Sequence, residues 1–364
     1  MKKPMSYRKE VTLVTLVAVT LAVIAIVVYV LFFGSLRKYE YKSDLKETST
    51  EPAIYATYED LLEGVGESYP FFQADMELYG GPSYVVPGLE MTVTLNDKTG
   101  KKAKCTSMTP QGLAVSDKYV FISSYCGTHK HKSVIYVINK ETAKLEKTLV
   151  LDSMSHVGGL AYDTENQRLW VAEFINKKAY VGALELSEIE GYDQNSGKAL
   201  KYSREVQLKG IKRASSVTYQ DGRLLVVYFN MWKNGLLNVY KIGEDGNVNS
   251  KPSYKIDIDN TVQGVAYENN LLIMTKSIGP LNSTLQVFDL SANVDKNNKL
   301  KFNKDMTFNA KDAIYNIAMP EKLEQIYFSD GKLYMLFESG AFAYRFLSFS
   351  NVDRVISLDI SKIK

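Results

Sequence analysis

The side chains that most often act as nucleophiles or metal ligands are scarce in this sequence, whose 364 residues include three histidines and two cysteines. His129 and His131 lie two residues apart in THKHK and could share a metal ion with further ligands. No Cys-x-x-Cys or His-Glu-x-x-His pattern accompanies them, so we interpret this stretch as a solvated loop. Cys105 and Cys126 could form a disulfide or remain free thiols, and the sequence leaves both outcomes open.

The motifs of common hydrolases and nucleotide-binding enzymes are also missing. No Gly-x-Ser-x-Gly sequence marks a nucleophile elbow. Residues 191–199 (GYDQNSGKA) are one residue too long for a phosphate-binding loop, and they carry Ala where that loop needs a hydroxyl group. The sequence therefore gives no direct support for either of these chemistries.

Beyond residue 90 the chain repeats one strand pattern five times. Each repeat has a short strand with a polar start, a tight polar turn and a longer apolar strand, and most repeats add a third strand and several a fourth. Four antiparallel strands per repeat are typical of a β-propeller blade. We therefore predict an all-β propeller of five four-stranded blades, with six blades, a β-sandwich or two small β domains as alternatives. The repeats begin at Gln111, Gly158, Ser215, Gln263 and Glu324.

The fifth repeat lacks an outer strand of its own. Residues 90–96 (EMTVTLN) precede the first repeat and belong to no blade. We expect them to supply the missing strand, because a closed ring leaves no exposed sheet edge.

The inner strands of a propeller surround its axis, so the blade starts indicate which side chains face the central channel. These positions are polar in every repeat, and we predict that they line a binding channel or solvate a water-filled one. Tyr228 and Trp232 flank a loop (YFNMWKN) and form a further candidate contact patch, with blade packing as the alternative. The predicted ring consists of Gln111, His156, Ser215, Gln263, and Glu324 with Gln325.

The starts QG-[LV]-A, HVGGLAYD and TVQGVAY, followed by strands such as RLWVAEF, resemble the β-propeller superfamily that includes gluconolactonase-like and NHL-repeat proteins. The resemblance covers about residues 90–364 and concerns the fold, which many enzymes and binding proteins share. Gluconolactonase-like enzymes hold a divalent cation such as Ca²⁺ in the channel. The resemblance thus implies metal ligands at Glu173, Asn230 and Glu324, and catalytic candidates at Glu173, Glu324 and His156. The sequence departs from that family, because no Asp falls at a blade start and Lys276 would repel a cation.

Residues 11–33 form an apolar stretch of 23 residues without a charge. As a helix they would span roughly 34 Å, enough to cross a hydrocarbon core of about 30 Å. The stretch is longer than the apolar region of a signal peptide, so we predict an uncleaved transmembrane anchor that contacts membrane lipid. It separates a tail (residues 1–10) from a stalk with a short helix at 53–65 (residues 34–89) and the propeller (residues 90–364).

The formal charge of +3 resides in the tail. Of 44 basic residues, four lie in residues 1–10, and of 41 acidic residues only Glu10 does, so the remaining 354 residues carry 40 of each sign. A neutral body argues against a nucleic-acid partner, which would require a basic face. A short basic tail ahead of a large domain predicts a cytoplasmic N-terminus and a propeller outside the cell membrane.

These observations predict a membrane-anchored extracellular propeller that acts as a binding or scaffold module for a protein or a cell-surface polymer, with no cofactor assigned. The alternative is a divalent-cation-dependent, lactonase-like hydrolase whose site lies in the central channel.

Protease added to intact cells is expected to degrade the propeller, because the predicted orientation exposes it to the medium. Immunoblots before and after lysis provide the measurement, with a cytoplasmic protein as the intactness control. A propeller that survives until the cells are lysed would place it inside and contradict this orientation.

Overall fold

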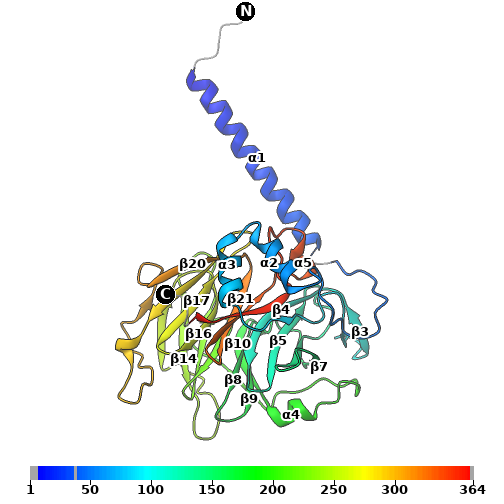
Figure 1. Ribbon diagram of the computed structural model, residues 1–364, viewed down its shortest axis with the longest axis vertical. Coiled ribbons are helices and arrows are strands. Elements are labelled where there is room, and N and C mark those ends of the chain that lie inside the picture. Colours follow the sequence, from blue (N-terminus) through cyan, green and yellow to red (C-terminus); the bar gives the residue numbers. More distant parts are fainter. Residues whose placement is uncertain (1–6, 37–38, 361–364) are drawn as a thin grey trace, which may run out of the picture.

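The computed structural model describes residues 7–36 and 39–360, so predictions about residues 1–6, 37–38 and 361–364 lie outside the described part. Helix α1 (Tyr7–Leu36) contains the predicted anchor and stands apart from a β-rich body (Figure 1). Among the described residues it is the one helix long and apolar enough to cross a membrane, and none of its residues Val11–Val28 is buried.

The body is a β-propeller of five blades, as predicted. Four strands of each blade form an antiparallel sheet, and a two-residue strand, β19 (Thr307–Phe308), adds a parallel edge to the third blade. From the axis outward, the first blade contains β4 (Met108–Val115), β5 (Tyr119–Cys126), β6 (Val134–Asn139) and β7 (Leu145–Val150), and the second contains β8 (Gly159–Asp163), β9 (Arg168–Ile175), β10 (Lys178–Glu185) and β11 (Arg204–Gln207). The third contains β12 (Ser216–Gln220), β13 (Arg223–Tyr228), β14 (Gly235–Lys241) and β15 (Tyr254–Ile258), and the fourth contains β16 (Val262–Glu268), β17 (Leu271–Lys276), β18 (Ser283–Asp289) and β20 (Tyr315–Met319). The fifth contains β21 (Leu323–Ser329), β22 (Lys332–Phe337), β23 (Arg354–Leu358) and β1 (Tyr84–Val85).

The glycines that recur at the blade starts allow the inner strands to approach one another closely. A Cβ atom on Gly159 would lie 2.6 Å from the backbone nitrogen of Val217 in the next blade. A Cβ atom on Gly264 would lie 2.7 Å from the carbonyl oxygen of Glu324 in the fifth blade. Any side chain at these two positions would push the blades apart, so the QG and GG motifs of the sequence are a packing requirement of the axis.

The strand that closes the ring is β1, and the prediction that residues 90–96 would do so is wrong. Tyr84 of β1 pairs with Val355, and the Val86 N–H donates to the Asp353 carbonyl at 3.0 Å. The predicted segment instead forms β2 (Thr92–Leu95), which pairs with β3 (Lys102–Cys105) in a separate hairpin. A two-residue strand is too short to show alternating polarity, which is why the sequence pattern favoured the longer segment.

Two short helices cover the fourth and fifth blades. Thr57 and Asp60 form a capping box, so α2 (Tyr58–Gly66) starts five residues later than the helix expected at 53–65. Helix α3 (Pro70–Tyr79) follows. Buried side chains of both helices join one apolar cluster with strands of the two blades, and the helices contribute Leu61, Leu62, Val65, Phe72 and Met76 to it.

The described part of the predicted stalk lies against the propeller. The Tyr41 N–H donates to Thr106 Oγ1 at 3.1 Å, and its hydroxyl donates to the Glu90 carboxylate at 2.8 Å. Farther along, the Ser49 N–H donates to the Met91 carbonyl at 2.8 Å. Since α1 ends at Leu36, the anchor is joined to the body by a tether of only a few residues.

One side chain connects the blades across the axis. Gln325 is fully buried, and its Oε1 accepts from the N–H groups of Leu113 at 2.9 Å and Leu160 at 2.8 Å. Its Nε2 donates to the carbonyls of Leu160 at 2.7 Å and Val217 at 2.8 Å. The amide thus uses both acceptor sites and both donor hydrogens to join the fifth blade to the first three.

Replacing Gln325 with Ala should lower the melting temperature strongly, because four buried backbone groups would lose their partner at roughly 1–3 kcal/mol each. Gln263→Ala is the matched control, since Gln263 is half-buried and its amide donates at 3.3 Å to one carboxylate. Thermal unfolding of the full-length protein in detergent, followed by circular dichroism, gives the comparison. Equal melting temperatures for the two variants would show that the amide does not hold the blades together.

Candidate functional site

The loops of the propeller gather at two faces. The loops between second and third strands, which include α5 (Phe342–Arg345), lie on the face from which α1 leaves (Figure 1). The turns between first and second strands, and α4 (Leu186–Gly191), lie on the opposite face. We call the end of the axis near α1 the anchor-side end, and the opposite end the distal mouth.

At the anchor-side end, three residues of the predicted ring form side-chain hydrogen bonds, and two of them bond to each other. Gln111 Nε2 donates to Glu338 Oε2 at 2.9 Å, and Gln263 Nε2 donates to Glu324 Oε1 at 3.3 Å. Burial, followed by repulsion from Glu338, raises the pKa of Glu324 well above its usual value, although Lys322 opposes the shift. A carboxyl group in this environment favours its neutral form and is a poor cation ligand.

The other two ring residues lie nearer the surface. His156 is exposed, and its ring stacks on Tyr125 with the ring centres 4.3 Å apart. Ser215 Oγ accepts a hydrogen bond from the Phe229 N–H at 3.2 Å. The candidate patch lies in the same region, with Trp232 86% exposed and Tyr228 half-buried at the end of β13.

The proposed cation ligands have separate sets of partners. Glu173 Oε1 accepts from the Tyr202 hydroxyl at 2.8 Å, within the second blade, while its Oε2 has no hydrogen-bond partner. Asn230 Oδ1 accepts from the Trp232 N–H at 3.1 Å and so orders its own loop. Glu324 bonds to the fourth blade through Gln263. These contacts do not bring the three side chains together around a cation.

One group of side chains in the described ranges could hold a metal ion through three or more His, Cys, Asp or Glu ligands. It lies beside the first blade, away from the axis, and neither the predicted ring nor the resemblance pointed to it as a set. Its members are Glu40, Cys105, Cys126 and His131.

The distal mouth contains a cavity of about 340 Å³. Four tyrosines from the inner strands of four blades line it, and the first blade has Val115 at the corresponding repeat position. The predicted ring does not include these tyrosines, although their recurrence near the end of four of the five inner strands (GLAY, SVTY, GVAY, QIY) is a detectable signal. They are Tyr162, Tyr219, Tyr267 and Tyr327.

The rim of the distal mouth is acidic and rich in amides. Glu165, Asp221 and Glu268 line the cavity together with Asn269 and Asn270, and no Lys or Arg lies among its lining residues. Burial, followed by the charge of the nearby Asp330, raises the pKa of the Glu268 carboxyl. Aromatic faces beside carboxylate and amide oxygens can bind apolar ring faces and polar hydroxyl or amine groups at once.

Side chains of the fifth blade cross the axis between its two ends. The Gln325 amide crosses the axis, and nearer the distal mouth the Tyr327 hydroxyl accepts from the Tyr162 N–H at 3.3 Å. The fifth blade therefore reaches across to the second blade at both levels.

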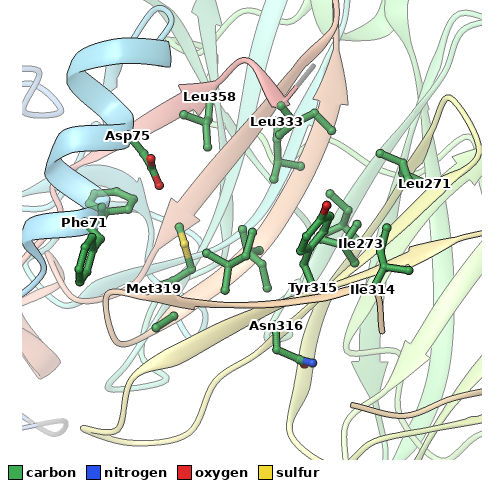
Figure 2. A pocket seen from close by; sticks show the side chains of 16 residues that line it. Phe71, Asp75, Leu271, Ile273, Ile314, Tyr315, Asn316, Met319, Leu333 and Leu358 are labelled. Carbon is green, nitrogen blue, oxygen red and sulfur yellow. The ribbon is translucent and has the colours of Figure 1, made fainter. Parts of the chain in front are cut away.

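A second hollow, of about 380 Å³, lies on the side of the body between α3 and the fourth and fifth blades (Figure 2). Its walls are largely apolar, with Phe71, Ile314 and Leu358 among them, and Asp75 is the one carboxylate that lines it. No nucleophile with an adjacent base is present in its lining, so this groove gives no support for catalysis.

No protein-family model matches the chain, and no curated protein sequence matches it. Among solved structures, it is similar to hydrazine synthase from Kuenenia stuttgartiensis (12% identity, TM-score 0.38), covering 62% of this chain and 55% of that one. It is also similar to a chain of a nidogen–laminin complex (9% identity, TM-score 0.38, 70% and 86%). A third is a candidate 6-phosphogluconolactonase from Bacteroides uniformis (11% identity, TM-score 0.32, 64% and 61%). The chain thus spans about half the length of the hydrazine synthase chain, and none of these likenesses bears on function.

The buried carboxyl group of Glu173 predicts a pH-dependent stability. Burial raises its pKa from 4.5 to about 7, so the native state keeps a proton that the unfolded chain releases, and stability falls as the pH rises between these values. Glu173→Gln should remove this dependence and be more stable than the wild type above pH 7, by at most about 3 kcal/mol. Melting temperatures between pH 4.5 and pH 8 test this. Glu63→Gln, at an exposed position, is the control, and parallel curves for the wild type and Glu173→Gln would contradict the prediction.

Proposed function

We propose that this protein is a membrane-anchored binding module that holds a neutral or amine-bearing polysaccharide chain in the distal mouth of its propeller. The observation that carries the proposal is the cavity lined by four tyrosines on the face opposite α1. With the anchor in the membrane and the propeller outside, this face would point away from the cell.

The lining of the distal mouth suits a carbohydrate. Tyrosine offers an apolar face that can cover a sugar ring and a hydroxyl that can bond to it, at low conformational cost. Here the Tyr267 hydroxyl donates to Asn270 Oδ1 at 3.1 Å, and the Tyr219 hydroxyl accepts from the Gly222 N–H at 3.1 Å, so both rings are held in place. A preorganised site loses less entropy when a ligand binds.

The charge of the rim selects among polymers. Glu165, Asp221 and Glu268 would repel uronic acids and polyphosphates, whereas an amino sugar would be attracted. A cationic peptide is the competing ligand, and the experiment below includes it as an outcome.

The face on the anchor side supports a position close to the lipid surface. Exposed apolar side chains project from three of its loops, namely Trp232 (86% exposed), Leu281 (64%) and Phe349 (79%). Aromatic side chains are favoured at the interface between headgroups and acyl chains. The short tether between Leu36 and Tyr41 would hold these loops near that interface.

The contacts of the predicted cation ligands do not favour the lactonase-like alternative. Its cation ligands would be Glu173, Asn230 and Glu324, whose hydrogen bonds lead to three different neighbours. The pKa values of both carboxyl groups are raised, chiefly by burial, which disfavours the charged form that a divalent cation needs.

Alanine substitution of Tyr219 or Tyr267 should weaken polysaccharide binding about tenfold each, because each loses the contact energy of one aromatic face. Calorimetric titration of the full-length protein, in a detergent without a sugar headgroup, would compare oligomers of N-acetylglucosamine, glucosamine and galacturonic acid with a lysine-rich peptide. Trp232→Ala, an exposed aromatic on the opposite face, is the control.

Binding of a glucosamine or N-acetylglucosamine oligomer that both tyrosine variants lose, and that Trp232→Ala retains, would support the proposal. Preference for galacturonate or for the peptide would contradict the assigned ligand class. Unchanged affinity in both tyrosine variants would remove the distal mouth from consideration.

A further inference from the structure

Four side chains of types that bind transition metals meet beside the first blade. Their donor atoms all lie within 4.8 Å of one another. Cys105 ends β3, Cys126 ends β5, and His131 follows in the loop after β5, each no more than 6% exposed. Glu40 reaches them from the segment that follows α1.

The three distances that join Glu40, Cys126 and His131 are close to those of a tetrahedral zinc site. Ordinary zinc bond lengths and a tetrahedral angle place sulfur and nitrogen ligands about 3.5 Å apart, nitrogen and oxygen about 3.3 Å, and sulfur and oxygen about 3.6 Å. In the structure, Cys126 Sγ lies 3.4 Å from His131 Nδ1, and Glu40 Oε1 lies 3.2 Å from the same nitrogen. Cys126 Sγ lies 3.9 Å from Glu40 Oε1.

Neighbouring groups orient these side chains as the outer shell of a metal site does. The Thr128 hydroxyl donates to Glu40 Oε1 at 2.7 Å, and Lys130 Nζ donates to Glu40 Oε2 at 2.9 Å. Backbone N–H groups face both sulfur atoms, that of Ser107 at Cys105 and that of Lys130 at Cys126. Such hydrogen bonds fix ligand orientation and are typical of metal sites in proteins.

We propose that Glu40, Cys105, Cys126 and His131 bind one Zn²⁺ ion in a closed, structural site. Two sulfur ligands and an imidazole favour zinc over Ca²⁺ or Mg²⁺, which take oxygen ligands. Four protein ligands leave no open position for a water molecule, so the ion would stabilise structure and take no part in catalysis.

The site would fasten the anchor to the propeller. Glu40 lies four residues after the end of α1, whereas the other three ligands belong to the β2–β3 hairpin and the first blade. A bound ion would therefore restrict rotation of the propeller about its tether. A disulfide between Cys105 and Cys126 is the competing arrangement, and it would leave Glu40 and His131 without this role.

The test measures zinc per chain in full-length protein, extracted with detergent and purified without chelators or metal-affinity resin. We expect one zinc ion in the wild type, in His129→Gln and in Thr128→Ala, with chelator competition showing about tenfold weaker binding for Thr128→Ala. Cys126→Ser and His131→Gln should lose the ion. Denatured wild type with chelator should then show two thiols that react with a maleimide.

Wild-type protein without zinc would overturn the proposal, whether its cysteines are joined in a disulfide or free. Loss of zinc from His129→Gln as complete as from His131→Gln would also overturn it, because His129 lies in the same loop but outside the cluster. If the Cys126 and His131 variants fail to fold, cobalt-substituted wild type decides. Thiolate-to-cobalt charge-transfer absorption supports the site, and bound cobalt without it contradicts the assigned ligands.

Discussion

The ring depends on one amide group. Gln325 lies on the inner strand of the fifth blade and satisfies backbone groups of the first, second and third blades at the same time. A buried backbone group without a hydrogen-bond partner raises the free energy of the folded state. The four backbone groups are therefore held within reach of the Gln325 side chain. The Gln325 side chain also lies across the axis, between the two faces of the propeller. One carries a buried acid and amide network near the anchor, and the other carries the tyrosine-lined cavity.

Most of the fold could be predicted from the sequence, because repeats and alternating polarity report directly on strands that pack in layers. The ring closure could not. Strand β1 consists of Tyr84 and Val85, and two residues contain no period to detect. The packing of the segment after the anchor could not be predicted either, because its polar composition gives no sign that Tyr41 and Ser49 bond to the body. The composition of a segment indicates whether its side chains can be exposed to water, whereas contacts with residues far away in the sequence decide where the segment packs.

The candidate sites also include residues that the sequence could predict and residues that it could not. The place of Gln111, Gln263 and Glu324 in the repeats predicted that they lie near the axis. Each of them forms a side-chain hydrogen bond at the anchor-side end of the axis. The tyrosines of the distal mouth were also within reach of repeat comparison, because they recur at the same position in four of the five repeats. The cluster of Glu40 with Cys105, Cys126 and His131 had no such signal. Its members come from segments up to about ninety residues apart with no metal-binding spacing, so only the folded chain brings them together.

Closure by β1 also has a consequence for biosynthesis. Val85 pairs with Arg354, so the two halves of the last blade are separated by almost the whole propeller sequence. Because a chain is synthesised from its N-terminus, Tyr84 and Val85 emerge before the rest of the propeller, and β23 is added only near the end of synthesis. Until then the fifth blade is incomplete and β1 has no partner strand, and before β21 is added the other inner strands also lack Gln325. Incomplete chains would therefore present open sheet edges, so the interval before β23 is added is the stage at which this fold is most prone to misassembly.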